Sequence, residues 1–199
     1  MTIALAVLAA YLLGSVPTGY VVARAFGIHD IRRHGSGNTG TTNVLRTAGR
    51  LPAVLTLLGD VAKGYGAIFV AGAIGGTPLG SSAGAVAVVV GNCWSVFLGF
   101  RGGKGFATGL GALLRLAPWA TWPAALVWLV TAAAFRFASL ASLTAAACIP
   151  LGALLLGQPL PVVTAAAVVA AIIVLRHRDN VARLLSGTEH RLGTRKNAA

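Results

Sequence analysis

Three short clusters of small, polar and basic residues interrupt an otherwise apolar chain. The first covers residues 34–43 (HGSGNTGTTN) and is followed by Arg46. Its glycines let the backbone turn several N–H groups toward one point, and the hydroxyl and amide side chains add further donors, a combination that can bind an anion. An ordinary glycine-rich loop has the same composition, so this alternative stays open. The candidate ligands are Ser36, Gly37, Asn38, Thr41, Asn43 and Arg46.

The second cluster, residues 99–105 (GFRGGKG), precedes a short apolar segment that could be a helix. Glycine N–H groups, a lysine and a helix N-terminus together favour phosphate binding, with Gly102, Gly103, Lys104 and Gly105 as candidates. The cluster is not a Walker A loop, because Gly105 rather than Ser or Thr follows the lysine. Kinase or ATPase chemistry is therefore disfavoured. The alternative is a basic turn at the lipid headgroups.

The third cluster begins with His177 and Asn180 and continues to residue 189. These two residues are three positions apart, so on a helix they share a face and could hold a phosphate or a hydroxyl. A basic segment beside a membrane span can also be only an orientation signal. We expect no metal site, because the four histidines are scattered and carboxylates do not cluster.

Asp60 and Lys63 lie inside an apolar run. Charges within a membrane span are candidates for function. At a spacing of three they can also neutralise each other on one helix face. We favour a structural ion pair.

The composition is that of an integral membrane protein. Hydrophobic residues make up 56% of the 199 residues, charged residues 10%, and the mean hydropathy is +0.80. Soluble domains carry about 25% charged residues. The net charge of +12 would suggest nucleic-acid binding in a soluble protein. Here the basic residues lie between long uncharged runs, which indicates membrane topology and an anionic substrate instead, with no nucleic acid as partner.

The uncharged runs predict the spans, since a helix needs roughly 20 residues to cross the hydrocarbon core. The expected spans cover residues 1–23, 51–75, 83–100, 105–114 and 116–135, and two more follow within 137–175. The segment 105–114 is a half-span of about 15 Å if helical. Basic residues crowd the first loop and the tail (Arg24, Arg32, Arg33, Arg46 and Arg50; Arg176, Arg178, Arg183, Arg191, Arg195 and Lys196). By the positive-inside rule both are cytoplasmic. We therefore predict one all-α domain over residues 1–199, a polytopic bundle of about seven helices with the N-terminus outside and the C-terminus cytoplasmic.

The clusters, in this order, resemble the bacterial membrane acyltransferases that use acyl-phosphate to acylate glycerol 3-phosphate. The matching segments are residues 14–19 (GSVPTG), 35–46 (GSGNTGTTNVLR), 60–64 (DVAKG), 96–108 (VFLGFRGGKGFAT) and 177–193 (HRDNVARLLSGTEHRLG). The resemblance implies transfer of a fatty acyl group to the sn-1 hydroxyl, giving lysophosphatidate and inorganic phosphate at the start of phospholipid synthesis. It implies no cofactor, no CoA and no acyl carrier protein. It also implies a seven-helix protein of the bacterial inner membrane whose site faces the cytoplasm. Asn92 and Ser95 stand where relatives often have His and Pro, and Asp179 stands where Glu is common.

The resemblance and the residues together suggest a mechanism. Acyl-phosphate is already activated, so the site must position two phosphates and neutralise their charge. No side chain is an evident general base, and a substrate phosphate is expected to take the proton. We assign glycerol 3-phosphate to Ser36, Arg46, Lys104, His177 and Asn180, and acyl-phosphate to Thr41, Asn43 and the backbone of 102–105. The acyl chain should lie in an apolar groove open to the bilayer. The rival function is a small permease for an anionic phosphate ester.

Overall fold

The computed structural model describes residues 1–193, which form α-helices and two short 3-10 helices with no strand among them. The predicted all-helical class is therefore confirmed. The tail residues Arg195 and Lys196, which entered the topology prediction, lie outside the described residues. The α-helices are α1 (Thr2–Ser15), α2 (Thr18–Ala25), α3 (Thr41–Thr47), α4 (Arg50–Gly75), α5 (Pro78–Cys93), α6 (Phe106–Leu116), α7 (Pro118–Phe135), α8 (Ala138–Leu155), α9 (Leu160–Arg176) and α10 (Arg178–Leu185). The 3-10 helices are η1 (Ile31–Arg33) and η2 (Val96–Leu98).

Five segments are long and apolar enough to cross a membrane. They are Thr2–Ala25, Arg50–Gly75, Pro78–Leu98, Pro118–Phe135 and Ala138–Leu155. A sixth is the pair α9 and α10, which bends by 59° at its junction, and α6 is a shorter apolar helix of 11 residues. This agrees with the spans expected from the sequence, including the half-span. The count of seven crossings stays a prediction.

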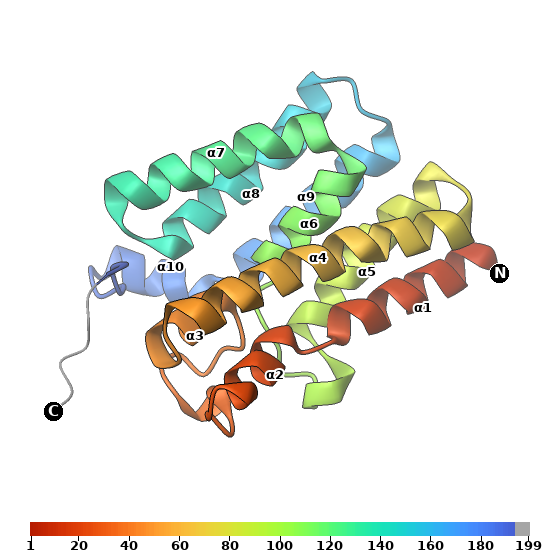
Figure 1. Ribbon diagram of the computed structural model, residues 1–199. Helices are drawn as coiled ribbons and strands as arrows, with labels where there is room; N and C mark the ends of the chain where they lie inside the picture. The colour runs from red at the N-terminus through yellow and green to blue at the C-terminus, as the bar shows by residue number, and fades with distance from the viewer. Residues whose placement is uncertain (194–199) are drawn as a thin grey trace, which may run out of the picture.

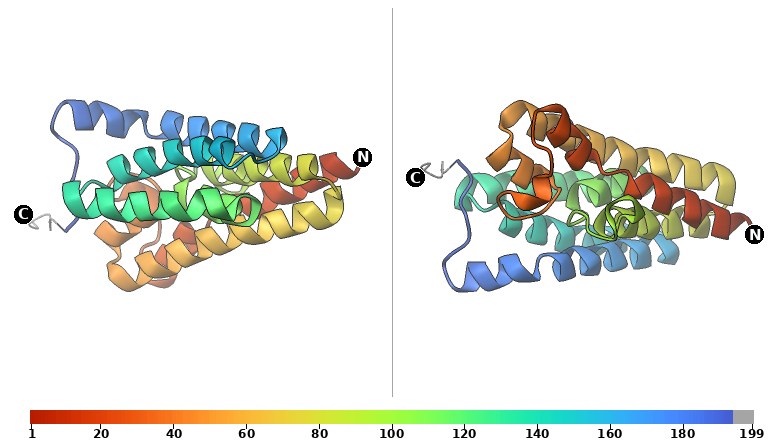
Figure 2. Two further views of the ribbon diagram at one scale, coloured as in Figure 1. Left: turned by 90° about the horizontal axis from the view of Figure 1, so that it is seen from above. Right: turned by 90° about the horizontal axis from the view of Figure 1, so that it is seen from below.

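The helices form an elongated bundle with two different ends (Figure 1, Figure 2). The N-terminus, the α4–α5 turn and the α8–α9 connection lie at one end. The other end carries α2, α3, α10 and the α7–α8 turn, and we call it the basic end. The loop after η2 runs back into the middle of the bundle, where α6 begins (Figure 1). The second polar cluster is therefore recessed between the helices.

Glycines let two pairs of helices touch through their backbones. A Cβ on Gly14 of α1 would lie 2.1 Å from the Val88 carbonyl oxygen of α5. A Cβ on Gly64 of α4 would lie 2.1 Å from the carbonyl oxygen of Thr108 in α6. Small residues are the usual means of close helix packing in membranes. These contacts fix α6 against α4 and α5 against α1.

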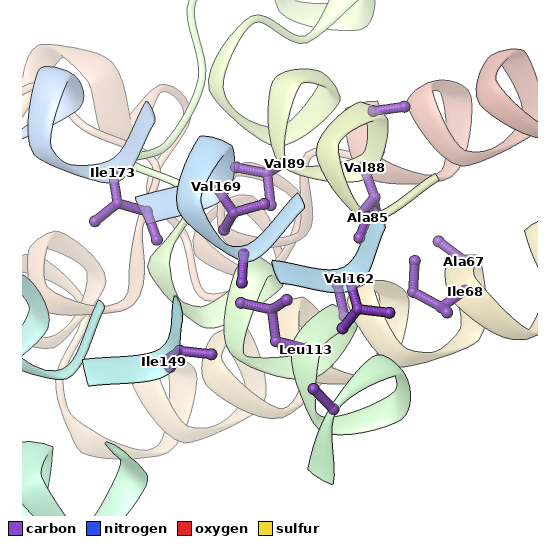
Figure 3. Close-up of a cluster of buried hydrophobic side chains, with 14 of the residues drawn as sticks. Ala67, Ile68, Ala85, Val88, Val89, Leu113, Ile149, Val162, Val169 and Ile173 are labelled. Atoms are coloured by element: carbon purple, nitrogen blue, oxygen red, sulfur yellow. The ribbon is translucent and has the colours of Figure 1, made fainter. Parts of the chain in front are cut away.

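The interior is filled by small and branched side chains, and the large ones face outward. Val88, Val89, Leu113, Val169 and Ile173 form the centre of the core, between α5, α6 and α9 (Figure 3). The many exposed large hydrophobic residues include Trp119 and Trp122 of α7. A water-soluble protein would bury such residues, whereas a bilayer solvates them. The arrangement is that of a multi-pass membrane protein.

Candidate active site

Asn43 organises the first polar loop from its centre. Its buried side-chain amide nitrogen lies 3.3, 3.0 and 2.8 Å from the carbonyl oxygens of Ile31, His34 and Asn38. Its Oδ1 accepts the N–H of Ser36 at 2.9 Å. The side chain is thus fully used within the loop. This revises the expectation that Asn43 binds a phosphate directly, and makes it a residue that holds the loop in shape.

The other candidate residues of this loop differ in whether their polar groups already have hydrogen-bond partners. Asn38 Oδ1 accepts the Gly40 N–H, and its Nδ2 donates to the Gly102 carbonyl at 3.4 Å, which joins the first loop to the second. The Gly37 N–H donates to His34, so Gly37 serves the turn. Ser36 is exposed. The Thr41 hydroxyl is buried and has no hydrogen-bond partner among residues 1–193, which leaves it available for a ligand.

The glycines of the second loop do not cradle an anion in the way the sequence suggested. The Gly102 N–H donates to the Cys93 carbonyl at 3.1 Å, and the Gly103 N–H donates to the Asn92 carbonyl at 2.8 Å. Arg176 donates to the Gly103 carbonyl from both Nε and Nη2. These two glycines therefore fix the path of the loop. Their N–H groups are not free for phosphate.

Free donors begin just beyond these glycines, at the start of α6. Gly105 precedes the helix at φ +82°, a conformation that favours glycine. The amides of Phe106, Ala107 and Thr108 have no hydrogen-bond partner within the described chain, as expected for the first turn of a helix. The Thr108 hydroxyl is also buried without a partner there. The free donors therefore lie one to three residues later in the chain than predicted, at a helix N-terminus, which is an arrangement that favours an anion.

Lys104 connects the second cluster to the third. Its Nζ donates to Asn180 Oδ1, and Asn180 Nδ2 donates to Glu189 Oε1 at 2.7 Å. Glu189 is buried, and it also accepts from Ser139 Oγ at 2.9 Å and from Arg183 Nε at 2.7 Å. Asn180 has one side-chain group on Lys104 and the other on Glu189. It therefore orients the ammonium, which modifies the predicted role of Asn180 as a direct ligand.

The charged groups around Lys104 include two arginines, and they favour the binding of an anion. Burial first, and then the cations Arg183 and Arg46, lower the pKa of Lys104 to about 8 against the opposite effect of Glu189. Burial raises the pKa of Glu189, but hydrogen bonds from Asn180, Arg183 and Ser139 outweigh it, and the net pKa is lowered. Desolvation also lowers the pKa of Arg46, and the charge of Arg183 adds to this effect while the charge of Glu189 opposes it. A bound phosphate would stabilise the charged form of both cations.

His177 stands just beyond the end of α9, at the bend into α10. Its ring is buried, and Nδ1 lies 2.7 Å from the Ile173 carbonyl oxygen. Because a carbonyl oxygen only accepts, Nδ1 carries the hydrogen and Nε2 is the acceptor of the neutral ring. Burial lowers the pKa of His177 to about 4, so the ring is neutral near pH 7. A neutral ring with a free Nε2 can accept from a hydroxyl, and it cannot donate a second hydrogen bond to a phosphate.

The predicted ion pair is present. Lys63 Nζ lies 2.8 Å from Asp60 Oδ1, and both side chains are about nine-tenths buried. Lys63 also donates to the Val16 carbonyl and to Asn92 Oδ1. The pair therefore connects the end of α1 with the end of α5. In residues 1–193, no three His, Cys, Asp or Glu side chains come together in a way that could hold a metal ion.

Sequence reasoning placed Glu189 in the third cluster without giving it a role, and it missed Ser139 entirely. A role for Glu189 could have been found, because it is one of only four acidic residues and falls inside a strongly basic segment. A carboxylate in such surroundings is expected to pair with a cation. Ser139 carries no such signal. It lies 50 positions before Glu189, and only packing brings the two together.

The fold and the site define a class: a multi-pass helical membrane protein with a buried, cation-rich site suited to phosphate. Comparison with known proteins narrows it further. The family described as "Glycerol-3-phosphate acyltransferase" matches residues 4–187, and the chain belongs to this family. It is an acyltransferase, as the sequence resemblance implied.

Relatives match the chain along almost its whole length. A glycerol-3-phosphate acyltransferase of Rubrobacter xylanophilus is 49% identical over 96% of both chains. One from Jannaschia sp. is 51% identical over 97% of this chain and 94% of its own. The crystal structure of PlsY (YgiH), an integral membrane glycerol 3-phosphate acyltransferase, in its glycerol 3-phosphate form has a TM-score of 0.92 at 40% identity, covering 98% of this chain and 97% of that one. Its lysophosphatidic acid form gives 0.90 at 39% identity, with the same coverage.

Proposed function

We propose that this acyltransferase transfers a fatty acyl group from acyl-phosphate to the sn-1 hydroxyl of glycerol 3-phosphate. The products are lysophosphatidate and inorganic phosphate, and the reaction begins phospholipid synthesis without CoA or acyl carrier protein. The observation that carries the proposal is the half-buried ammonium of Lys104, held by Asn180 beside the open N-terminus of α6. The solved relatives, crystallised in glycerol 3-phosphate and lysophosphatidic acid forms, support the acceptor and the product.

We assign the phosphate of glycerol 3-phosphate to Ser36, Arg46 and Lys104. These groups offer a hydroxyl and two cations, and the two cations have pKa values that an anion would raise. His177 suits a hydroxyl of the glycerol, because its neutral ring presents the acceptor Nε2. Asn180 acts by holding Lys104 in place.

The acyl-phosphate group is assigned to the first turn of α6 and the hydroxyl of Thr41. The free amides of residues 106–108 and the helix dipole favour the doubly charged phosphate and the oxyanion that forms on the acyl carbonyl. The sn-1 oxygen attacks the carbonyl carbon, and the bond between that carbon and the phosphate oxygen breaks. Phosphate leaves with the electron pair of the broken bond.

The hydroxyl proton passes to the departing phosphate. No carboxylate of the site is free to accept it, since three side chains donate to Glu189 and Asp60 is paired with Lys63. His177, with a pKa of about 4, is a weak base. It orients the hydroxyl while the phosphate takes the proton, which keeps the reaction balanced without a further reactant.

An apolar depression beside the start of α6 suits the acyl chain. It is lined by Phe106 and Gly109 of α6 and by neighbours of α8 and α9, and all the lining residues are apolar. Leu113, Ile149, Val169 and Ile173, which Figure 3 labels in the core, are among the residues that line it. A chain attached to a phosphate at the first turn of α6 would run along this depression toward the lipid.

We further propose that the protein lies in the bacterial inner membrane with its site facing the cytoplasm. The first polar cluster leads into α3 and the third continues through α10, and both helices lie at the basic end together with the α7–α8 turn that carries Arg136. The positive-inside rule then places the basic end in the cytoplasm. The same asymmetry speaks against the rival permease, in which polar groups are expected near the membrane midplane.

Purified protein incubated with acyl-phosphate and glycerol 3-phosphate tests the function. We expect release of inorganic phosphate in equal amount to lysophosphatidate, measured by mass spectrometry, and no product when acyl-CoA or acyl carrier protein is the donor. Absence of turnover with acyl-phosphate would overturn the proposal. Uptake of glycerol 3-phosphate into protein-containing vesicles without acylation would support the permease instead.

A further inference from the structure

The buried lysine of α4 has no part in the proposed reaction, yet every one of its donors is in use. Lys63 Nζ donates to Asp60 Oδ1 at 2.8 Å, to the Val16 carbonyl at 2.8 Å and to Asn92 Oδ1 at 2.9 Å. An ammonium has three N–H groups. Lys63 therefore has no donor left for a substrate, and whatever it does must pass through these three partners.

Asn92 is the partner that leads to the reacting groups. Its side chain accepts from Lys63, and its backbone carbonyl accepts the Gly103 N–H at 2.8 Å. A Cβ built on Gly103 would lie 2.8 Å from Asn92 Nδ2, so the loop lies flat against this side chain. The residue that follows Gly103 is Lys104. Asn92 thus ties the ion pair to the residue before the proposed phosphate-binding lysine.

The other end of the same segment, at Thr108, packs against α4. Gly64, which follows Lys63, packs directly against the Thr108 carbonyl in the first turn of α6. The segment 102–108 is therefore held at one end by Asn92 and at the other by the backbone of α4. The contact that fixes this segment against α4 is at Gly64, the residue after Lys63.

We propose that Lys63, neutralised by Asp60, is a positioning residue that acts through Asn92 to set where Lys104 and the first turn of α6 meet the substrate phosphates. The proposal rests on the proposed function. A charged group suits this task because one ammonium can bind three acceptors at once: Asp60 on its own helix, the Val16 carbonyl at the end of α1 and Asn92 in the last turn of α5. The Val16 carbonyl precedes Pro17 at the break between α1 and α2, and it accepts the Thr18 N–H at 3.0 Å as well as the Lys63 ammonium.

The first test changes Asn92 alone, so that its contact with Lys63 is lost while the ion pair of Asp60 and Lys63 stays in place. Asn92→Leu keeps the size of the side chain and removes its contact with Lys63, and Asn92→Asp keeps the acceptor. Ser82→Ala is the matched control, because Ser82 is buried near the other end of α5 and its hydroxyl has no partner among residues 1–193. Each protein is purified in nanodiscs and followed by amide hydrogen exchange over residues 97–106, and the Leu variant and the control are also assayed for kinetics.

We expect Asn92→Leu to speed amide exchange in residues 102–105 and to lower kcat/KM for glycerol 3-phosphate by about tenfold, the effect of losing one charge-assisted hydrogen bond. Asn92→Asp should exchange like the wild type, and Ser82→Ala should match the wild type in both measurements. Wild-type exchange and kinetics in Asn92→Leu would overturn the proposal. If the wild type itself has no acyltransferase activity, the proposed function fails, while the exchange experiment still decides whether Asn92 holds the loop.

The second test removes the ion pair without leaving a buried charge. In the double variant Asp60→Leu/Lys63→Met both charges are replaced by apolar groups, a change that proteins often tolerate in stability. We expect a folded, membrane-inserted protein with a wild-type melting temperature, and a kcat/KM for glycerol 3-phosphate lowered about tenfold or more. Full activity in this folded variant would overturn the proposal. Should the double variant not fold, the Asn92 pair gives the decision.

Discussion

At the residue scale, Lys104 obtains its chemistry from its neighbours. Burial and nearby arginines weaken its hold on its proton, while Asn180 fixes the direction of its ammonium. Such a group is poorly stabilised until an anion arrives, and it then gains a charge-assisted hydrogen bond in a partly dehydrated site. The same burial makes its charge sensitive to pH.

The pKa of about 8 for Lys104 predicts an alkaline decline of activity in the free enzyme. The ammonium binds phosphate, and it loses its proton as the pH rises through the pKa, so kcat/KM should fall above about pH 8. Lys104→Ala should cost about tenfold or more at pH 7. Lys104→Arg should recover part of this loss and abolish the decline, since guanidinium stays charged. Arg115→Ala, at the other end of the bundle, should keep the wild-type profile, and an unchanged profile in Lys104→Arg would contradict the assignment.

His177 offers a second residue-scale prediction. If its ring only orients a hydroxyl, His177→Ala should raise KM for glycerol 3-phosphate and leave measurable turnover at saturating substrate. The reason is that the proton goes to phosphate rather than to the ring, whose pKa is already about 4. Steady-state kinetics with each substrate varied in turn would measure this. A collapse of kcat at unchanged KM would identify His177 as the base.

At the element scale, the turn between α7 and α8 holds the C-terminal segment on the site. The Leu192 N–H donates to the Arg136 carbonyl at 2.6 Å, and the Arg136 side chain donates back to the Leu192 carbonyl at 2.9 Å. Ser139, in the first turn of α8, donates to Glu189. A helix pair that contributes no phosphate ligand of its own therefore positions the carboxylate that orients Asn180.

The hydrogen bonds that connect Ser139, Glu189, Asn180 and Lys104 predict mutational effects of different size. Glu189→Gln removes the ion pair with Arg183 and replaces one of the two acceptor oxygens by a donor, which must face either Arg183 or the Asn180 amide. Both melting temperature and activity should therefore fall, the activity about tenfold or more. Ser139→Ala removes one of three hydrogen bonds and should cost less. Thr164→Val is the control, because its exposed hydroxyl bonds only to carbonyls of its own helix α9. Equal activity of Glu189→Gln and the wild type would show that the chain to Lys104 is not needed.

At the scale of the whole molecule, charge is distributed along the bundle axis. The basic residues of α2, α3, α10 and the α7–α8 turn gather at one end, and Arg101 and Lys104 belong to the loop that runs back into the middle of the bundle. A charged end and an apolar middle fit a bilayer in one orientation, because positive loops are retained in the cytoplasm. The site would then receive water-soluble glycerol 3-phosphate from the cytoplasm and the acyl chain from the lipid.

Cysteine labelling in intact cells tests this orientation. With Cys93 and Cys148 replaced by alanine, Leu79→Cys at the exposed start of α5 should react with an impermeant thiol reagent added outside. His29→Cys, exposed in the loop before η1, should react only after the membrane is opened. Both variants must retain activity for the comparison to hold. The opposite labelling pattern would reverse the predicted topology.

The sequence by itself determined the class, the helical spans and the residue clusters of this protein. Hydropathy adds up over neighbours in the chain, so runs of apolar residues identify the spans without any knowledge of their packing. The ion pair of Asp60 and Lys63 was predictable for the same reason, since both charges lie on one turn of one helix.

Only the tertiary structure decided which polar groups are free to bind. Gly102 and Gly103 looked available in the sequence, but the end of α5 takes their N–H groups, and the open donors lie in the first turn of α6. Glu189 became part of the site through Ser139, 50 positions away. A hydrogen bond forms with whichever partner packing brings within about 3 Å, and distance along the chain says nothing about that partner when the helices between them turn back on themselves.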